Sequence, residues 1–317
     1  MKIRIGIAGA AGYAGGELTR LLQHHPKAWV KYLESKSRDK QRVNSAHEDI
    51  TRDDLFFSKI RTTGIDALFL CGGHGFASRF LAERDPRRAR VIDIGNDFRL
   101  GNAGGFTYGL PEKNREAIRE ARRVANPGCF ATAIELALLP LAAHGRANKE
   151  VTVFGVTGST GAGQQPSTET HFSFRAQNLS NYKVFTHQHL DEVRETLQQN
   201  GAGPDIAFVP TRGAHTRGII ANVVFRDHSP LEELKTLYRA YYNAHPFVIV
   251  RDAPVHLKQV VNTNYCFLNI QQHEDKVLVT TVIDNLLKGA VGQAVQNMNL
   301  MFGLEETTGL LLKASYF

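Results

Sequence analysis

The chain is 317 residues long, with 42% hydrophobic and 22% charged residues, a composition typical of globular enzymes that excludes disordered and fibrous classes. This length predicts two domains of ordinary size. Lys and Arg number 38 against 31 Asp and Glu, but they are scattered, so the net charge of +7 favours a small anionic substrate over nucleic acid.

The first part of the chain alternates strand and helix patterns. Lys2 to Ala8 is typical of a short buried strand, and from Gly15 the apolar spacing becomes helical. Further strands are expected at three places, namely Trp29 to Leu33, Ala67 to Leu70 and Val91 to Ile94. Strands that alternate with helices predict an α/β domain with a parallel sheet.

A glycine-rich turn joins the first strand to the first helix. It reads Gly9-Ala-Ala-Gly12-Tyr-Ala-Gly15, a GxxGxxG spacing rather than the standard GxGxxG. Backbone N–H groups at such a helix start can face a pyrophosphate, although a plain turn would also use some of the glycines. We expect dinucleotide contacts from Gly9, Ala11, Gly12, Tyr13, Ala14 and Gly15.

The end of the second strand normally selects between NAD and NADP. Here it reads Glu34-Ser-Lys-Ser-Arg38. Ser35, Lys36 and Ser37 suit a 2′-phosphate, whereas Glu34 alone could hold a ribose diol. We therefore expect NADP, the alternative being a solvated loop.

Cys129 stands where a strongly apolar helix, expected from about Cys129 to Ala143, follows Pro127 and Gly128. The positive end of a helix favours thiolate over thiol, and its free N–H groups can hold an oxyanion. Most lone cysteines are small buried residues, an interpretation that fits Cys71 and Cys266. The sequence predicts Cys129 as a nucleophile.

Three cysteines without close spacing indicate neither a zinc site nor a disulfide framework. A cytoplasmic, reducing location fits them best. We expect no metal, and no apolar run is long enough to span a membrane.

After residue 128 the expected strands become longer and several alternate in polarity. This pattern predicts an α+β domain with a mixed or antiparallel sheet that has one wet face. The strands are expected at Val151 to Val156, Ile206 to Pro210, Gly218 to Phe225, Tyr265 to Gln271 and Lys276 to Ile283, with a last helix at Gly289 to Met301.

Two further groups of residues are candidates for the chemistry. His187 and His189, with Glu192 nearby, could supply an acid–base group, although the pair could also begin a metal site. Arginine's planar fork suits carboxylate and phosphate, but a structural ion pair is the common alternative. The candidate anion holders are Arg99, Arg175, Arg212 and Arg217.

Six motifs in order closely resemble the N-acetyl-gamma-glutamyl-phosphate reductase family of arginine biosynthesis, from about residue 3 to residue 304. They are Gly9 to Gly15, Tyr108-Gly-Leu-Pro-Glu112, Asn126-Pro-Gly-Cys129, Ser159-Thr-Gly-Ala-Gly163, His187-Gln-His189 with Glu192, and Asp284-Asn-Leu-Leu-Lys-Gly-Ala290.

The resemblance implies a Rossmann domain at 1–128 completed by 289–317, and a catalytic domain at 129–288 whose mixed sheet helps form a homodimer or homotetramer. By motif, Cys129 matches the nucleophile and His189 the acid–base residue, and His187 is the second candidate for the acid–base role. Asn285 and Lys288 match the stretch beside the nicotinamide, and Asn126 and His187 join the arginines as substrate contacts.

One segment departs from the family. Many relatives have a histidine and a second proline after the proline of Phe208-Val-Pro-Thr211, where this chain has Thr211 and Arg212. The acyl phosphate could therefore be succinylated, an aminoadipyl phosphate or an aspartyl phosphate. A different class of function is a nucleotide-binding sensor that uses Cys129 as a redox switch.

Overall fold

The computed structural model describes residues 1–147 and 150–317. They form two compact units, Met1–Pro127 with Ala290–Leu311 and Gly128–Gly289 with Leu312–Phe317, here called the first and second units. The last six residues, expected in the first domain, therefore group with the second unit. There the Ser315 N–H donates to the Val261 carbonyl at 3.0 Å, a contact that sequence patterns do not reveal.

A six-stranded parallel sheet is the centre of the first unit, which confirms the Rossmann-type prediction. The two strands β5 (Thr107–Tyr108) and β6 (Arg123–Ala125) were not predicted, because stretches so short carry no readable alternation. In sheet order the strands are β2 (Ala28–Glu34), β1 (Ile3–Ala8), β3 (Ala67–Leu70), β4 (Arg90–Asp93), β6 (Arg123–Ala125) and β5 (Thr107–Tyr108).

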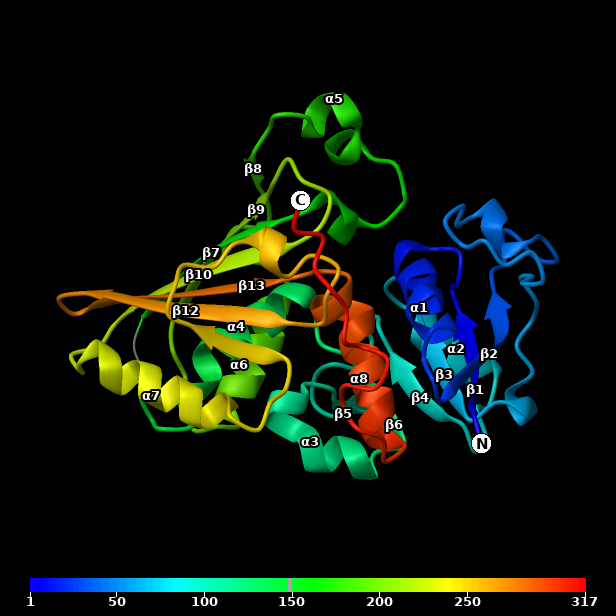
Figure 1. The fold of residues 1–317 in the computed structure, drawn as a ribbon, viewed down its shortest axis with the longest axis horizontal. Coiled ribbons are helices and arrows are strands. Elements are labelled where there is room, and N and C mark those ends of the chain that lie inside the picture. The colour runs from blue at the N-terminus through cyan, green and yellow to red at the C-terminus, as the bar shows by residue number, and fades with distance from the viewer. Residues whose placement is uncertain (148–149) are drawn as a thin grey trace. The chain divides into compact units, whose positions relative to one another are not determined.

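Four α-helices belong to this unit: α1 (Tyr13–Gln23), α2 (Phe76–Glu83), α3 (Pro111–Glu120) and α8 (Gly292–Met301). Leu18, Leu21 and Leu22 give α1 a buried face, as their helical spacing predicts. Figure 1 shows α8, near the end of the chain, beside α3 from its middle. The predicted start of this last helix at Gly289 was early, because a π-helical turn, Leu287–Val291, precedes α8.

A seven-stranded mixed sheet forms the second unit, and most of its neighbouring strands are antiparallel, as predicted. Polarity alternation located its long strands to within a few residues, but not the short strands β8 (Ser180–Asn181) and β11 (Val248–Arg251). In sheet order the strands are β11 (Val248–Arg251), β12 (Cys266–His273), β13 (Lys276–Ile283), β10 (Ile219–Arg226), β7 (Val151–Thr157), β9 (Ile206–Arg212) and β8 (Ser180–Asn181).

The helices of the second unit are α4 (Cys129–Ala142), α5 (Phe172–Arg175), α6 (His189–Gln198) and α7 (Leu231–Tyr242). Every residue of α4 after Cys129 is buried, because α4 packs between the sheet and the neighbouring α6 and α7. Short 3-10 helices complete the two units at Val43–Ser45, Thr62–Gly64, Ala103–Gly105, Ser159–Ala162, Thr168–Thr170 and Leu257–Gln259.

Within residues 1–147 and 150–317, no helix combines the length and the apolar character that crossing a bilayer requires.

Candidate active site

The three glycines of the turn before α1 each have a distinct structural reason. Gly9 has a φ of 79°, and a Cβ there would lie 2.9 Å from the Cys71 backbone. A Cβ on Gly15 would lie 2.5 Å from Ala10, whereas one on Gly12 would meet only the Gly9 oxygen at 3.7 Å. The first glycine thus makes the turn, the third permits close helix–strand packing, and the second leaves open space, the division found in dinucleotide-binding turns.

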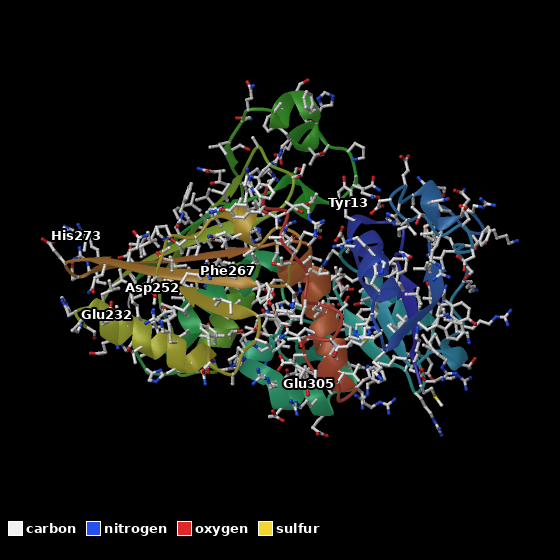
Figure 2. The ribbon with its side chains drawn as sticks, in the orientation of Figure 1. Tyr13, Glu232, Asp252, Phe267, His273 and Glu305 are labelled. Atoms are coloured by element: carbon white, nitrogen blue, oxygen red, sulfur yellow. The ribbon has the colours of Figure 1, made fainter. Side chains whose placement is uncertain are left out.

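The start of α1 is suited to an anion. It follows Gly12, so no side chain at that position caps the first-turn N–H groups. Tyr13, labelled in Figure 2, is the first residue of the helix and is 40% exposed. The residues present therefore fit a dinucleotide pyrophosphate.

The carboxylate at the end of β2 has structural partners. Glu34 Oε2 accepts the Ile60 N–H at 2.7 Å and lies 2.7 Å from Arg84 Nη1. Beside it, Ser35 is buried with its hydroxyl 3.3 Å from that of Ser37, while Lys36 is exposed. Ile60 and Arg84 thus engage the Glu34 carboxylate, while Ser35, Lys36 and Ser37 place two hydroxyls and a cation beside it.

Cys129 is the first residue of α4, the position predicted for it, and it is half-buried. A Cβ on Gly289 would lie 2.8 Å from Cys129 Cβ, so the absence of a side chain there makes room for the cysteine. Cys266 is fully buried, and burial together with the charge of Asp93 raises the pKa of Cys71. Of the three cysteines, Cys129 alone begins a helix.

His189 lies against the start of α4. A Cβ on Gly128 would be 2.4 Å from His189 Nε2, so only glycine lets the imidazole approach this closely. Glu192, one turn along α6, accepts the Gly128 N–H through Oε2 at 2.8 Å, and its Oε1 lies 4.0 Å from His189 Nε2. A carboxylate, an imidazole and the cysteine-bearing helix end are therefore assembled in the second unit.

His187 has a different environment from its neighbour. Its Nδ1 accepts the His189 N–H at 3.2 Å, which assigns the ring proton to Nε2 and engages the first N–H of α6. Its ring contacts those of Phe130, Tyr182 and Phe208. Burial, followed by the charges of His189 and Lys183, lowers the pKa of His187 to about 3, so this ring is neutral near pH 7.

Arg175 and Arg212 share one part of the second unit with Tyr182. The Arg212 guanidinium lies 3.9 Å from the centre of the Tyr182 ring and 2.8 Å from Glu169. Arg175 donates to the Gly213 carbonyl at 2.7 Å, and burial together with the charge of Arg212 lowers its pKa. Burial, followed by the charge of Cys129, raises the pKa of Tyr182.

Sequence reasoning missed Tyr182 and Glu169. Tyr182 follows the two-residue strand β8, and Glu169 lies in the turn Thr168–Thr170. Neither belongs to a recognisable motif, and only the pairing of β8 with β9, the strand that carries Arg212, brings Tyr182 to the guanidinium.

Other predicted site residues have structural partners. Arg217 forms an ion pair with the fully buried Asp284 at 3.0 Å, the alternative considered for a lone arginine. The Asn285 amide accepts the Gly218 N–H at 2.7 Å and donates to Thr160 at 2.9 Å, and Lys288 is fully buried in the π-helical turn.

Arg99 and Asn126 belong to the first unit. Arg99 donates to the Ile94 carbonyl at 3.0 Å. Asn126 is fully buried, donates to the Ala290 carbonyl at 3.0 Å and accepts from Asn297 at 3.1 Å. Its side chain thus serves the packing of α8, which is a sufficient reason for its presence.

Two family models match the chain in succession. One, described as the NAD binding domain of semialdehyde dehydrogenase, matches residues 4–121, and the other, described as the dimerisation domain, matches residues 129–285. Among the described residues, no group of three or more His, Cys, Asp and Glu side chains could hold a metal ion.

Solved structures with the same fold include aspartate semialdehyde dehydrogenases. The Vibrio cholerae enzyme II complexed with ASA superposes with a TM-score of 0.77 at 15% identity, covering 96% of this chain and 99% of that one. The Candida albicans enzyme with NADP superposes with a TM-score of 0.71 at 14% identity, covering 95% and 99%. At these identities the likeness concerns the fold alone.

Much closer relatives are found by sequence. A protein named N-acetyl-gamma-glutamyl-phosphate reductase from Christiangramia forsetii is 48% identical over 99% of this chain and 100% of its own length. A protein of the same name from Phocaeicola vulgatus is 47% identical over the same shares. With nearly half of all residues identical from end to end, the chain belongs to the N-acetyl-gamma-glutamyl-phosphate reductase family.

Proposed function

We propose that the protein reduces N-acetyl-gamma-glutamyl phosphate to N-acetylglutamate semialdehyde and phosphate in arginine biosynthesis, with NADPH as reductant. The start of α4 carries this proposal, because the chain belongs to this family and has Cys129 as the first residue of α4, with His189 and Glu192 beside it. The arrangement supplies a nucleophile, an acid–base group and a carboxylate that positions them.

The proposed chemistry proceeds through Cys129. Its thiolate attacks the acyl carbon, a C–S bond forms, the bond to the phosphate oxygen breaks and phosphate leaves. The dinucleotide, when bound, supplies the hydride that reduces the thioester. The N–H groups at the start of α4 stabilise the oxyanion and His189 protonates it to a hydroxyl. His189 then takes this proton back as the C–S bond breaks, which releases the aldehyde and restores the Cys129 thiolate.

The two histidines differ in ways that support His189 as the acid–base residue. His187 is neutral near pH 7 because of its low pKa, and its Nδ1 is engaged by the His189 N–H. A group with a pKa of about 3 is a poor proton donor at neutral pH. In this proposal His187 therefore orients His189 and fills the wall of the substrate site.

NADP is favoured over NAD by the partners of Glu34. Since the Ile60 N–H and Arg84 both engage its carboxylate, Glu34 is occupied by the protein itself. Ser35, Lys36 and Ser37 remain to receive a 2′-phosphate. Asn285 and Lys288 remain proposed cofactor contacts by their motif.

Arg175 and Arg212 are the proposed holders of the substrate's phosphate and α-carboxylate. They belong to the same unit as Cys129, and the shift of the Arg175 pKa by Arg212 indicates that their positive charges add. Arg212 pairs with the exposed Glu169, whereas Arg217 pairs with the fully buried Asp284 and Asn126 is itself fully buried, so Arg217 and Asn126 are weaker candidates. Arg99 remains a proposed substrate contact of the first unit.

A homo-oligomer is proposed through the uncovered face of the seven-stranded sheet. Phe154 on β7 and Val224 on β10 alternate with buried neighbours and are 44% and 42% exposed. The name dimerisation domain, carried by the model that matches this unit, supports a second copy as the occupant of this face. The three free cysteines are consistent with a reducing cytosol.

The test is a panel of acyl phosphates assayed with NADPH and with NADH. Acetylated, succinylated and unacylated glutamyl phosphates, an aminoadipyl phosphate and aspartyl phosphate are compared, or the matching semialdehydes are oxidised in the reverse direction with phosphate. We expect the acetylated substrate and NADPH to give the highest kcat/KM. Turnover of another acyl phosphate at higher kcat/KM would replace the substrate, and no turnover at all would favour the redox sensor.

A further inference from the structure

His47 lies outside every motif of the sequence but reaches the glycine turn. It follows the 3-10 helix Val43–Ser45 in the long connection between β2 and β3. Two backbone hydrogen bonds of one antiparallel bridge hold this connection in place, since the Phe57 N–H donates to the Gln41 carbonyl at 2.9 Å and the Val43 N–H donates to the Leu55 carbonyl at 2.9 Å. Val43 and Phe57 are fully buried, so the connection presents His47 from a packed base.

The imidazole of His47 is buried against the turn. Its Nε2 lies 2.8 Å from the carbonyl oxygen of Ala10, and because a carbonyl only accepts, Nε2 is the donor. The ring occupies the space beside Gly16, where a Cβ would be 2.5 Å from ring atoms. The side chain is only 9% exposed, so this contact is a fixed part of the first unit.

This contact determines how one peptide of the turn is oriented. Gly9 and Ala10 donate their N–H groups to the Glu34 carbonyl at 3.0 and 2.9 Å, so the turn is held on that side by β2. In a trans peptide the carbonyl and the following N–H point in opposite directions. With the Ala10 carbonyl directed at His47, the Ala11 N–H is directed away from it.

We propose that His47 is a positioning residue for the dinucleotide, which it serves by fixing the peptide whose Ala11 N–H faces the pyrophosphate. The inference rests on the proposed function as a dinucleotide-dependent reductase. It also accounts for the unusual spacing, because GxxGxxG has one more residue between its first two glycines than GxGxxG does. The longer turn has an additional peptide to fix, and His47 does so.

The test compares His47→Leu with His47→Gln. Leucine fills the space without a donor, whereas the glutamine amide can still donate to Ala10. Loss of one buried hydrogen bond is expected to raise KM for NADPH by about tenfold in His47→Leu. We expect kcat and KM for the acyl phosphate to stay within about twofold, and His47→Gln to recover most of the loss.

Discrimination between the dinucleotides supplies a further readout. The pyrophosphate is common to NADH and NADPH, so His47→Leu should weaken both equally and leave their KM ratio unchanged. An altered ratio would assign His47 to the 2′-phosphate segment instead. An unchanged KM for NADPH in His47→Leu, or an equal fall of kcat with NADPH and with NADH, would overturn the proposal.

Gly16 provides a control for folding. Gly16→Ala should displace the imidazole from Ala10 and reproduce the NADPH defect, with a lower Tm. The double variant Gly16→Ala, His47→Ala removes the clash, so its Tm should recover while its NADPH affinity stays low. Recovery of both together would show that His47 acts only on stability.

Affinity for NADPH is also measured by fluorescence titration, which requires no turnover. An inactive protein that still binds NADPH, and binds it less tightly in His47→Leu, would contradict the proposed reaction but not the role of His47. Should His47→Leu fail to fold by circular dichroism, His47→Asn keeps a polar side chain too short to reach Ala10 and should show the same loss of affinity.

Discussion

Helices α1 and α4 both begin directly after a glycine, and they use that start differently. Gly12 precedes α1 and leaves open space, so what the helix presents is its own backbone N–H groups. Gly128 precedes α4, and the His189 ring fills the space that the glycine leaves. The Gly128 N–H donates to Glu192. We propose that the start of α1 receives an anion and that the start of α4 activates a sulfur.

The difference follows from what surrounds each helix start. The turn before α1 is held through its backbone, by the Glu34 carbonyl and by His47. The turn before α4 is held by an ionisable pair, which can move a proton as well as hold a shape. Binding by backbone and catalysis by side chains should therefore respond to different substitutions.

Cys129→Ser should have the largest effect and tests that separation. Loss of the thiolate removes the nucleophile, and kcat should fall at least about a thousandfold. NADPH binding, measured by fluorescence, should stay within about twofold, because the contacts proposed for NADPH leave out the sulfur. Thioester trapping by mass spectrometry should detect the acyl group on Cys129 of the unaltered enzyme, and substantial activity in the variant would end this mechanism.

His189→Asn should have the next largest effect, and His187→Asn is its matched control. Removing the acid–base group should lower kcat by roughly a hundredfold or more. An asparagine at position 187 can still accept the His189 N–H, so kcat should fall by only about tenfold or less. A larger loss in His187→Asn than in His189→Asn would exchange the proposed roles, and pH profiles of kcat would identify which variant loses an ionisation.

A smaller effect is expected at the end of β2. Ser35→Asp places a carboxylate where the 2′-phosphate is proposed to bind, so the preference for NADPH over NADH should fall by about tenfold or more. The measurement is kcat/KM for both dinucleotides. Glu34→Gln is the control, since Glu34 is bound to Arg84 and Ile60, and it should reduce stability while leaving the preference unchanged. A changed preference for NADPH over NADH in Glu34→Gln alone would indicate that Glu34 binds the ribose.

The smallest effects concern the pH dependence of stability, which should differ in sign between two buried groups. Burial raises the pKa of Asp93 from 3.8 to about 6, so the folded chain retains a proton that the unfolded chain releases. Its contribution to stability is present below pH 3.8 and is lost as pH rises through about 6. Asp93→Asn should therefore raise the free energy of unfolding by roughly 2 kcal/mol at about pH 8 and by little at about pH 4.

His187 should show the opposite trend. Its pKa is lowered from 6.5 to about 3, so stability is present above pH 6.5 and is lost as pH falls through about 3. His187→Asn should flatten this acid limb in urea unfolding experiments at several pH values. Parallel pH slopes in the two variants would contradict the assigned environments.

The sequence by itself determined the elements whose patterns are long and regular. The apolar strands of four or more residues other than β11, the leucine spacing of α1 and the start of α4 at Cys129 were predicted to within a few residues, because their patterns are clear in the local sequence. The order of six motifs also identified the family, since the agreement of many short segments is far more specific than any one of them.

Only the tertiary structure decided which of the candidate side chains are free to act. Glu34, Arg217 and Asn126 resemble ligand-binding residues in sequence, and each is engaged by partners distant along the chain. Tyr182 and His47 carry no motif, yet each is brought to a candidate site by strand pairing or by a packed connection. Hydrogen bonds and ion pairs between distant residues have no signature in local sequence, because they depend on how the strands are ordered in the sheets.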